Sequence, residues 1–404
     1  MESLKRLFKI GFGPSSSHTM GPRKASIIFA DAIRDNGLAA DHFEVTLFGS
    51  LAATGKGHLT DRAILDVLTP VAPTEIIWKP EIELPRHPNA MTIKAFFPDN
   101  EREPVEQTFY SIGGGDIVIE GQSEENNSEN IYDLCTISEI LEWCENTGHS
   151  FWEYVEMREG PEIWNYLGRV WDVMTAAVER GIEAEGVLPG GLGVRRKAVS
   201  YYVRAAGYNS SLKSRGLVYA YALAVSEENA SGGEIVTAPT CGSCGVLPAV
   251  LYHLQASKNF SRQRILRALA TAGLFGNVVK TNASVSGAEV GCQGEVGVAC
   301  AMAAAAASQL FGGTPAQIEY SAEMGLEHHL GLTCDPVCGL VQIPCIERNA
   351  YAAARALDAN LYSAFSDGRH SVTFDRIVEV MKQTGHDLPS IYKETARGGL
   401  AAIH

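Results

Sequence analysis

The chain is organised around a stretch that opens with Ser284-Val-Ser-Gly-Ala-Glu-Val-Gly-Cys292-Gln-Gly-Glu-Val-Gly297 and closes with Cys334-Asp-Pro-Val-Cys-Gly-Leu-Val-Gln-Ile-Pro-Cys345-Ile-Glu-Arg-Asn349. An alanine run lies between, and charge is scarce except beside the cysteines. A thiol-rich, otherwise apolar setting suits a soft metal centre better than simple core packing. The spacing alone is a poor metal signature, because Cys292, Cys334 and Cys345 are 42 and 11 residues apart and the compact spacing of ferredoxins is absent. Unrelated buried thiols are the common alternative.

The composition, with 404 residues, 46% apolar and 20% charged, is typical of a soluble globular protein of two or three domains. A net charge of −14 argues against nucleic acid or an anionic membrane as a partner. The N-terminus has no apolar signal core, and no run reaches the roughly 18 apolar residues of a spanning helix. Nine cysteines, an odd number without a secretion signal, indicate the reducing cytoplasm, where thiols are free, catalytic or metal-bound.

Residues 1–125 are predicted to form a mixed α/β domain. A helix is expected over 23–36, with Pro22 in its first turn and Asn36-Gly37 at its end. Strands are expected at 43–49, where apolar residues alternate with a period of two, and at 75–78, 91–97 and 105–112. Pro98-Asp99-Asn100 is a turn signal that would join the last two strands as a hairpin.

Two loops of this domain carry candidate functional side chains. Ser15 to Thr19 should form an exposed turn ahead of a helix, and the hydroxyls, imidazole and amides of this turn would bind a carboxylate or phosphate. An ordinary serine-rich capping loop is the alternative. The stretch 49–58 looks like a phosphate loop, but five residues instead of four separate Gly49 from Gly55, which excludes nucleotide binding. His58 stands in this glycine-rich loop, where functional groups are commonly displayed, although a lone histidine is more often a surface residue.

The rest of the chain is predicted to be helical. Residues 126–150 are interpreted as a linker and first helix, with the polar segment 122–130 as the linker, and 151–404 as a compact all-helical domain. Apolar periodicity predicts helices over 136–145, 150–180, 211–228, 246–256, 262–275, 293–311, 315–326, 346–365 and 374–385. The predicted fold class is therefore α+β, an N-terminal mixed α/β domain followed by an all-α helical bundle.

A second cysteine motif, Cys241-Gly-Ser-Cys244, would suit a redox pair or half a zinc site. No second pair completes a zinc site, and no βαβ pattern surrounds it. Pro239, Gly242 and Gly245 instead indicate a tight loop entering a helix.

Five longer motifs are spread along the chain: Gly13-Pro-Ser-Ser-Ser-His-Thr-Met-Gly-Pro22, Tyr110-Ser-Ile-Gly-Gly-Gly115, Glu185-Gly-Val-Leu-Pro-Gly190, Ser286-Gly-Ala-Glu-Val-Gly-Cys-Gln-Gly-Glu-Val-Gly297 and the segments 332–337 and 342–349. Together they resemble the bacterial iron–sulfur-dependent L-serine dehydratases (L-serine ammonia-lyases) in their single-chain form. The similarity runs from residue 11 to about 400, and several motifs exceed eight residues, so chance agreement is negligible.

The resemblance implies a 4Fe-4S cluster held by Cys292, Cys334 and Cys345 in the helical domain, with the Ser-Ser-Ser-His-Thr loop of the α/β domain set against it. It implies a cytoplasmic homodimer that converts L-serine to pyruvate and ammonia by β-elimination of water, without electron transfer. Both halves occupy one chain here, whereas some relatives divide them between two subunits. The N-terminal domain also lacks a longer insertion found in other single-chain members.

The residues are consistent with that chemistry. Three thiolates on a four-iron cluster leave one iron open, which can act as a Lewis acid on the β-hydroxyl. An imidazole near its ordinary pKa suits removal of the α-proton, and we assign His58 as this base. An exchange of roles between His58 and His18 is an open alternative. The groups expected to hold the substrate carboxylate or the departing hydroxide are His18, Ser15, Ser16, Ser17 and Thr19.

Two features depart from the pattern of the family. Many relatives end in a cysteine that covers the open iron, whereas this sequence ends Gly398-Gly-Leu-Ala-Ala-Ile-His404. Water or a small anion on that iron is favoured, with His404 as the alternative ligand. The other thiols near the motifs are expected to be small buried packing residues: Cys241, Cys244 and Cys338.

Other functions compete with this interpretation. A hydro-lyase for threonine or another β-hydroxy amino acid would share the motifs, because the sequence does not reveal the pocket volume. A pyridoxal-phosphate dehydratase would give the same products, but no convincing Schiff-base lysine is present. An iron or redox sensor that binds serine without turnover is disfavoured, because the acidic chain has no DNA-reading motif.

Overall fold

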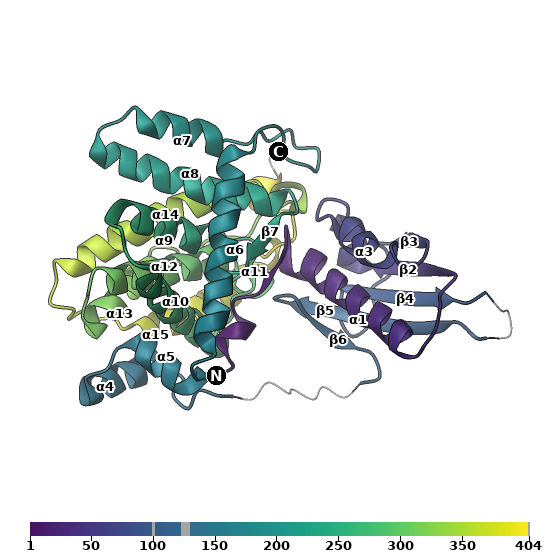
Figure 1. The fold of residues 1–404 in the computed structure, drawn as a ribbon, viewed down its shortest axis with the longest axis horizontal. Helices are drawn as coiled ribbons and strands as arrows, with labels where there is room; N and C mark the ends of the chain where they lie inside the picture. Colours follow the sequence, from purple (N-terminus) through teal and green to yellow (C-terminus); the bar gives the residue numbers. More distant parts are fainter. Residues whose placement is uncertain (99–101, 123–129, 403–404) are drawn as a thin grey trace. The chain divides into compact units, whose positions relative to one another are not determined.

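The computed structural model describes residues 1–98, 102–122 and 130–402 and divides into two compact units (Figure 1). The helical unit comprises Met1–Gly11, Asn127–Leu188 and Leu192–His404. The α/β unit comprises Phe12–Asn126 and Pro189–Gly191. Residues 1–11, which were predicted to belong to the α/β domain, pack with the helices. Most of the predicted linker, residues 123–129, lies outside the described residues.

The α/β unit is built on a five-stranded sheet with the order β3-β2-β4-β5-β6. Its strands are β2 (His42–Phe48), β3 (Thr74–Lys79), β4 (Ala90–Phe96), β5 (Val105–Gly113) and β6 (Asp116–Ile119). Strands β2 and β3 are parallel, whereas the other pairs are antiparallel. The predicted alternation of β2 is confirmed, since Phe43, Val45 and Leu47 are fully buried. The β4–β5 pair is the predicted hairpin, although residues 99–101 lie outside the described part of the chain.

Helix α1 (Gly21–Asp35) supplies the apolar layer of this unit. Pro22 lies in its first turn and Asn36 caps its end, as predicted. The ring of Phe29 packs edge-on against Phe43, with 6.2 Å between centroids. The parallel crossover from β2 to β3 passes through two short helices that the sequence did not predict, α2 (Gly49–Thr54) and α3 (Thr60–Leu68).

The helical unit contains the remaining elements (Figure 1). In chain order they are η1 (Leu4–Arg6), β1 (Ile10–Phe12, whose last residue belongs to the other unit), α4 (Ile137–Thr147), α5 (Phe151–Glu159), α6 (Ile163–Glu183), α7 (Ala198–Ala206), α8 (Ser210–Ala230), β7 (Glu234–Val236), α9 (Val246–Lys258), α10 (Arg262–Asn282), α11 (Gly287–Val290), η3 (Gln293–Gly297), α12 (Val298–Leu310), α13 (Pro315–Glu327), η4 (Val337–Gly339), α14 (Cys345–Ala364), α15 (Phe374–Asp387), η5 (Ser390–Tyr392) and η6 (Gly399–Ala402).

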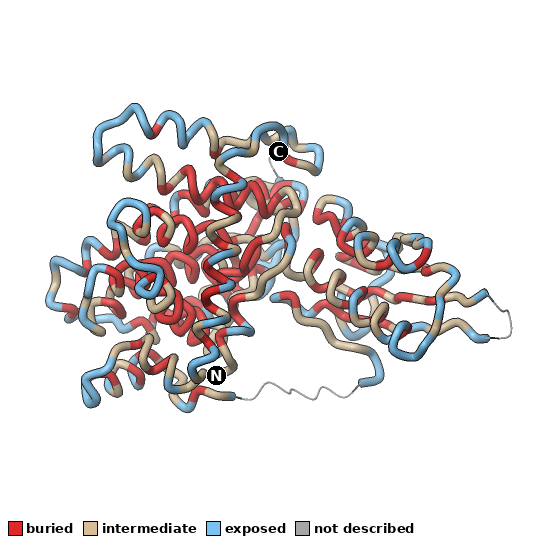
Figure 2. Tube along the Cα trace, in the orientation of Figure 1, coloured by how far each residue is buried: buried red, intermediate tan, exposed pale blue. Residues whose placement is uncertain are grey.

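Helix α12 forms the centre of this unit. All of its residues except Gln309 are buried, and Figure 2 shows the buried segments concentrated in the interior helices. Its alanines allow close approach of α13, because a Cβ on Gly325 would lie 3.0 Å from the Cα of Ala301. The hydroxyl of Ser321 on α13 also donates to the carbonyl of Ala304 at 3.1 Å. The predicted α+β fold class is confirmed.

The helical unit differs from prediction in four respects. The predicted helix over 150–180 is two helices, because Gly160 adopts φ 75° and Pro161 follows it. A short strand, β7, interrupts the all-helical pattern, and α7 was not predicted. The helix predicted from residue 293 begins as the π-helical turn η3.

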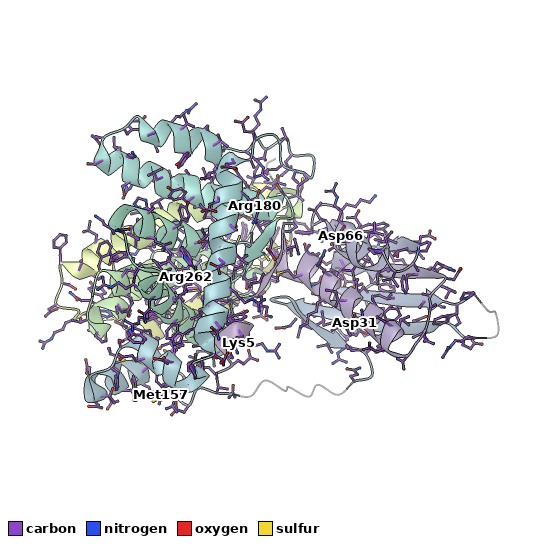
Figure 3. The ribbon with its side chains drawn as sticks, in the orientation of Figure 1. Lys5, Asp31, Asp66, Met157, Arg180 and Arg262 are labelled. Carbon is purple, nitrogen blue, oxygen red and sulfur yellow. The ribbon has the colours of Figure 1, made fainter. Side chains whose placement is uncertain are left out.

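Ion pairs join neighbouring helices of this unit. Arg180 on α6 and Arg196 both donate to Glu228 on α8, at 3.0 and 2.9 Å. Figure 3 labels Arg180 and Arg262 in this unit. Arg262 at the start of α10 makes a two-pronged contact with Asp172 on α6. Nowhere in the described ranges is a helix both long and apolar enough to cross a membrane.

Candidate active site

The three predicted cluster cysteines come together in the helical unit from separate segments. Cys292 immediately precedes η3, Cys334 lies in the loop before η4, and Cys345 is the first residue of α14. Cys292 and Cys334 are 3% and 5% exposed. The pKa of the Cys334 thiol is raised well above its usual range, first by burial, then by Glu295 and Glu394, and also by Cys292 and Cys345. The thiols therefore lie within electrostatic reach of one another.

These thiols are held protonated by their surroundings. Burial, with a smaller contribution from Glu295, raises the pKa of Cys292 to about 12, although Arg348 acts in the opposite direction. Burial also raises the pKa of Cys345, and the neighbouring Cys292 adds to the effect. A bound metal centre deprotonates coordinating thiols, so this environment favours thiolates only when a strong cation is present.

The carboxylate of Glu295 and the guanidinium of Arg348 lie beside the thiols. The hydroxyl of Thr240 donates to Glu295 Oε1 at 2.7 Å, and Cys334 Sγ lies 3.7 Å from Glu295 Oε2. Arg348 donates to the carbonyl of Thr333 and, at 3.0 Å, to Asp335 Oδ1. Sequence reasoning missed Glu295 and Arg348 although both stand inside the quoted motifs, because no local pattern distinguishes them from other charged residues.

Backbone contacts close the site tightly around these groups. A Cβ on Gly287 would lie 2.7 Å from Glu295 Oε2 and 2.9 Å from Cys334 Sγ, so only glycine fits there. The amide of Asn349 donates to the carbonyls of Gly242 and Cys345, and its oxygen accepts from the Gly245 N–H. Asn349 thereby joins the loop before α9 to the start of α14.

The segment 390–402, here called the C-terminal strap, packs along the Cys334 loop. The Cys334 N–H donates to the Tyr392 carbonyl at 2.8 Å, and the Glu394 N–H donates to the Cys334 carbonyl at 2.7 Å. Further along, the Leu400 N–H donates to Asp335 Oδ2 at 2.8 Å. Loss of hydration and the nearby Glu295 raise the pKa of Glu394 to about 8. His404, considered above as an iron ligand, lies outside the described residues.

The remaining cysteines near the motifs divide into two kinds. Cys241 and Cys244 are buried in the tight loop that enters α9, as predicted. Cys338 is exposed and adopts φ 53°, so its assignment as a buried packing residue was wrong. All nine cysteines are free thiols.

The donor chemistry of the site fits an iron–sulfur cluster. Within the described residues, no three histidine, cysteine, aspartate or glutamate side chains converge as the ligands of a single metal ion would. Thiolates at separate corners of a multi-iron cluster have no need to converge on one point. Two buried thiols and the half-buried Cys345, beside a guanidinium and a hydrogen-bonded carboxylate, supply the soft ligand set that iron and sulfide require.

The second set of predicted residues lies in the α/β unit, where the stretch predicted as an exposed turn is the π-helical turn η2 (Ser16–Met20). That prediction was wrong, since Ser15, His18 and Thr19 are 2–6% exposed. The reason is a set of hydroxyl bonds: Thr19 donates to the His58 carbonyl at 2.7 Å and Thr60 to the His18 carbonyl at 2.6 Å.

The imidazole of His18 is held at both nitrogens. Its Nδ1 lies 2.9 Å from the hydroxyl of Ser17, and its Nε2 lies 3.0 Å from that of Ser50. The backbone N–H of His18 donates to Ser15 Oγ at 3.2 Å. Burial, together with the neighbouring His58, lowers the pKa of His18 well below its usual value. His18 is therefore a neutral imidazole at pH 7.

His58 lies beside His18, with 4.6 Å between the ring centroids. It occupies the turn between α2 and α3, is 5% exposed, and places Nδ1 3.2 Å from Thr54 Oγ1. The structure thus brings His58 together with His18, Ser15, Ser17 and Thr19 in one hydroxyl-rich cluster. Ser16 belongs to the same turn.

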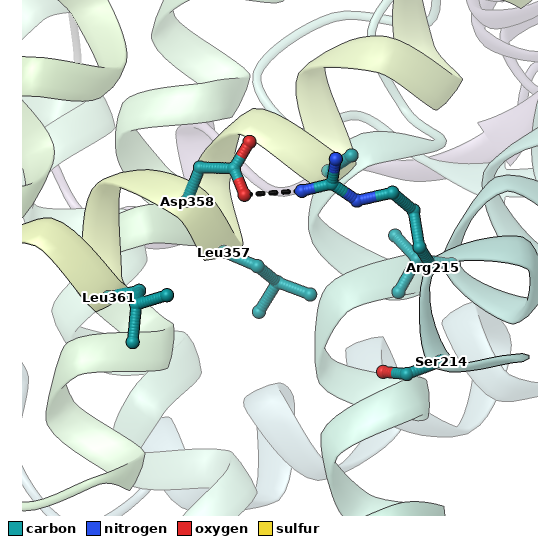
Figure 4. A pocket seen from close by; sticks show the side chains of 7 residues that line it. Ser214, Arg215, Leu357, Asp358 and Leu361 are labelled. Atoms are coloured by element: carbon teal, nitrogen blue, oxygen red, sulfur yellow. Dashed lines mark hydrogen bonds and ion pairs between the residues drawn. The ribbon is translucent and has the colours of Figure 1, made fainter. Parts of the chain in front are cut away.

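A separate hollow of about 250 Å³ lies between α8 and α14 (Figure 4). Its charged groups, Arg215 and Asp358, form an ion pair with each other. None of its seven lining residues is a cysteine or histidine. Its charges are paired with each other and none of the predicted site residues lines it, so this hollow is not the candidate site.

Comparison with known proteins identifies the class to which these features belong. The family model "Serine dehydratase alpha chain" matches residues 100–401, and "Serine dehydratase beta chain" matches residues 3–76 and 68–122. The chain therefore belongs to the serine dehydratase family.

Individual relatives are similar over nearly their whole length. L-serine dehydratase TdcG of Escherichia coli (strain K12) is 42% identical over 445 aligned positions, covering 98% of this chain and 97% of the relative. L-serine dehydratase of Streptomyces coelicolor is 41% identical, with 98% and 97% covered. L-serine dehydratase of Haemophilus influenzae is 42% identical, with 99% of each covered.

Proposed function

We propose that this chain is an L-serine ammonia-lyase that converts L-serine to pyruvate and ammonia at a non-redox 4Fe-4S cluster. The observation that carries the proposal is the group of three thiols beside Glu295 and Arg348, in which Cys292 and Cys334 are buried and Cys345 is half-buried. Family membership and the names of the full-length relatives support serine as the substrate. Cys292, Cys334 and Cys345 would hold the cluster.

When bound, a cluster with three thiolate ligands supplies an open iron as a Lewis acid toward the β-hydroxyl of the substrate. The protein residues then perform the proton chemistry. We assign His58 as the base for the α-proton, because an imidazole can accept a proton at neutral pH. His18 is fixed as a neutral imidazole by Ser17 and Ser50, so its role is to orient and to donate hydrogen bonds.

In this proposal, the hydroxyls of the η2 turn bind a negatively charged group of the substrate or product. We assign Ser15, Ser16, Ser17 and Thr19 to the substrate carboxylate or the departing hydroxide. Loss of the α-proton and of the β-hydroxide releases one water and leaves an enamine, which tautomerises and is hydrolysed to pyruvate and ammonia. Electrons are neither gained nor lost, so no redox partner is required.

Anaerobic reconstitution with iron and sulfide, followed by a pyruvate assay, tests the proposal. We expect a visible iron–sulfur absorbance that oxygen bleaches, together with pyruvate and ammonia in equal amounts from L-serine. Turnover without that absorbance would contradict the cluster. Absorbance and serine binding without turnover would favour a sensor.

Threonine is the second substrate to test, because the family motifs are compatible with any β-hydroxy amino acid. We expect L-serine to be preferred, and a parallel ammonia assay with L-threonine checks this. A homodimer is also part of the proposal, and sedimentation analysis of the reconstituted protein measures it.

A further inference from the structure

One side chain of α14 holds the residues on both sides of Cys334. Arg348 donates from Nη1 to the carbonyl of Thr333 and from Nη2 to Asp335 Oδ1, the latter at 3.0 Å. Arg348 lies three residues after Cys345, the first residue of α14. The guanidinium therefore connects the loop that carries one predicted cluster ligand to the helix that begins with another.

The same loop is also attached to the segment of Cys292. The Gln293 N–H donates to the carbonyl of Leu332 at 3.3 Å, and Gln293 Oε1 accepts from the Gly331 N–H at 2.9 Å. Gln293 is fully buried. Backbone contacts thus fix the start of the Cys334 loop against the Cys292 segment, and Arg348 fixes the part of the loop that contains Cys334 against α14.

The guanidinium of Arg348 is suited to bridging protein groups. It is planar and permanently charged, and it presents its N–H donors as a rigid fork that fits two acceptors at once. Its side chain is 18% exposed and that of Asp335 is 4% exposed. The second oxygen of Asp335 accepts from the Leu400 N–H at 2.8 Å, so the pair also holds the C-terminal strap. A lysine would keep the charge but would lose the fork.

We propose that Arg348 is a positioning residue that holds Cys334 at the separation from Cys292 and Cys345 that a shared iron–sulfur cluster requires. This inference rests on the proposed function, which assigns the three thiols to the cluster. Ligands of a metal centre bind best when other residues fix them in advance. The Cys334 loop cannot move away from α14 without breaking both hydrogen bonds of Arg348.

The reactivity of Cys334 in the apoprotein provides the first test. Pulsed alkylation with iodoacetamide, followed by peptide mass spectrometry, measures a separate rate for each cysteine. Because two hydrogen bonds are lost in Arg348→Gln, we expect Cys334 to react about 10-fold faster or more. Cys300, which is fully buried in α12, should react at the wild-type rate.

The matched control is Arg355→Gln, which makes the same change seven residues later on α14. Arg355 is 63% exposed and pairs with Asp358. This variant should alter neither the alkylation rate of Cys334 nor that of Cys300. A faster reaction of Cys334 in Arg348→Gln alone would therefore report the loss of the bridge and not the loss of a positive charge on the helix.

The reconstituted protein provides the second test. Iron release to a chelator, followed anaerobically by the loss of visible absorbance, should be about 10-fold faster in Arg348→Gln than in the wild type. Arg348→Lys should lie between them, because lysine can reach one of the two acceptors. With rates normalised to bound iron, the KM for L-serine should stay at the wild-type value, because both terminal nitrogens of the guanidinium bind protein groups.

Three outcomes would overturn the inference alone, in a wild type that carries the cluster. The first is an Arg348→Gln protein with wild-type rates of Cys334 alkylation and iron release. The second is an equal acceleration of Cys334 and Cys300, which would indicate general destabilisation. The third is a raised KM with iron release unchanged, which would make Arg348 a substrate-binding residue. A wild type that takes up no iron and sulfide would overturn the proposed function and this inference together.

Discussion

The two candidate regions contain chemically different side chains: the histidine cluster of the α/β unit (His18, His58 and the surrounding hydroxyls) and the thiol group of the helical unit (Cys292, Cys334 and Cys345). The first contains imidazoles and hydroxyls that bond to one another, with His18 held by Ser17 and Ser50. The second contains thiols, carboxylates and Arg348, whose pKa values shift one another. One set of groups is suited to moving protons between neutral partners, and the other to holding a strongly charged centre.

The two regions also differ in how the chain assembles them. The histidine cluster comes mostly from residues 15–19, 50–60 and 111. The thiol group needs segments around 240, 290, 340 and 394, which only the tertiary fold brings together. If the proposed function is correct, damage to the thiol group should remove the proposed cluster and the activity together, whereas damage to the histidine cluster should remove the activity alone.

The largest effect is expected from Cys334→Ser. A serine hydroxyl is a poor ligand for iron, so the cluster absorbance and serine turnover should both be lost to background. Absorbance, iron content and the pyruvate assay measure this. Cys338→Ser, four residues away at an exposed position, is the matched control and should retain both. A Cys334→Ser protein with full activity would remove this thiol from the ligand set.

The next largest effect is expected from His58→Ala. Loss of a general base costs roughly 10²- to 10⁴-fold in rate, so turnover should fall by that factor while absorbance stays unchanged. The comparison with Cys334→Ser shows whether the two regions divide the work as proposed. His18→Ala distinguishes the alternative in which the histidines exchange roles, since the larger loss of kcat should follow the base. Substantial activity in His58→Ala would refute its assignment.

A smaller effect is expected from Gly287→Ala. The added methyl group would lie 2.7 Å from Glu295 Oε2 and 2.9 Å from Cys334 Sγ, and crowding of this kind costs about 1–3 kcal/mol. The melting temperature should fall, and the cluster should form less completely. Gly168→Ala on α6 is the control, because its nearest atom would be 3.5 Å away and alanine favours a helix. Equal melting temperatures for the two variants would show that the site is looser than its contacts indicate.

The smallest effect concerns acid stability of the α/β unit. The pKa of His18 is lowered in the folded state, so the unfolded chain binds the proton more readily. The free energy of unfolding is therefore unaffected by His18 above pH 6.5, the ordinary histidine pKa. It decreases progressively as the pH falls below that value. The melting temperature of the apoprotein, followed from pH 8 to 5, should decrease less steeply in His18→Asn than in the wild type. The exposed His42→Asn is the control, and identical slopes for all three proteins would contradict the expectation.

Local patterns in the sequence predicted most of the secondary structure. The alternation in β2 and the apolar stripe of α1 are local signals, and both elements form where they were expected. Helices α2 and α3 were not predicted because the residues between them are rich in glycine. In the fold, α2 packs against β2 and β3, and α3 packs against β3. Gly160 and Pro161 are a sequence signal for the break between α5 and α6. The signal was overlooked because the aromatic residues on either side keep a helical periodicity.

The candidate sites were predictable to different degrees. His18 and the serines stand in one short motif, although the sequence could not show that other hydroxyls bury them. The cysteine spacing alone was a weak signal, and the resemblance to a family singled out Cys292, Cys334 and Cys345. The contact of the C-terminal strap with the Cys334 loop was not predicted, because it joins residues sixty positions apart in the chain.

The packing of residues 1–11 with the helical unit has a consequence for a chain cut in two. Leu4 and Phe8 are fully buried, and the Leu4 N–H donates to Glu159 on α5. A single cut within residues 123–129 would leave this anchor covalently attached to the α/β fragment. The two fragments would then be expected to copurify, because the buried side chains of residues 1–11 hold them together without the peptide bond.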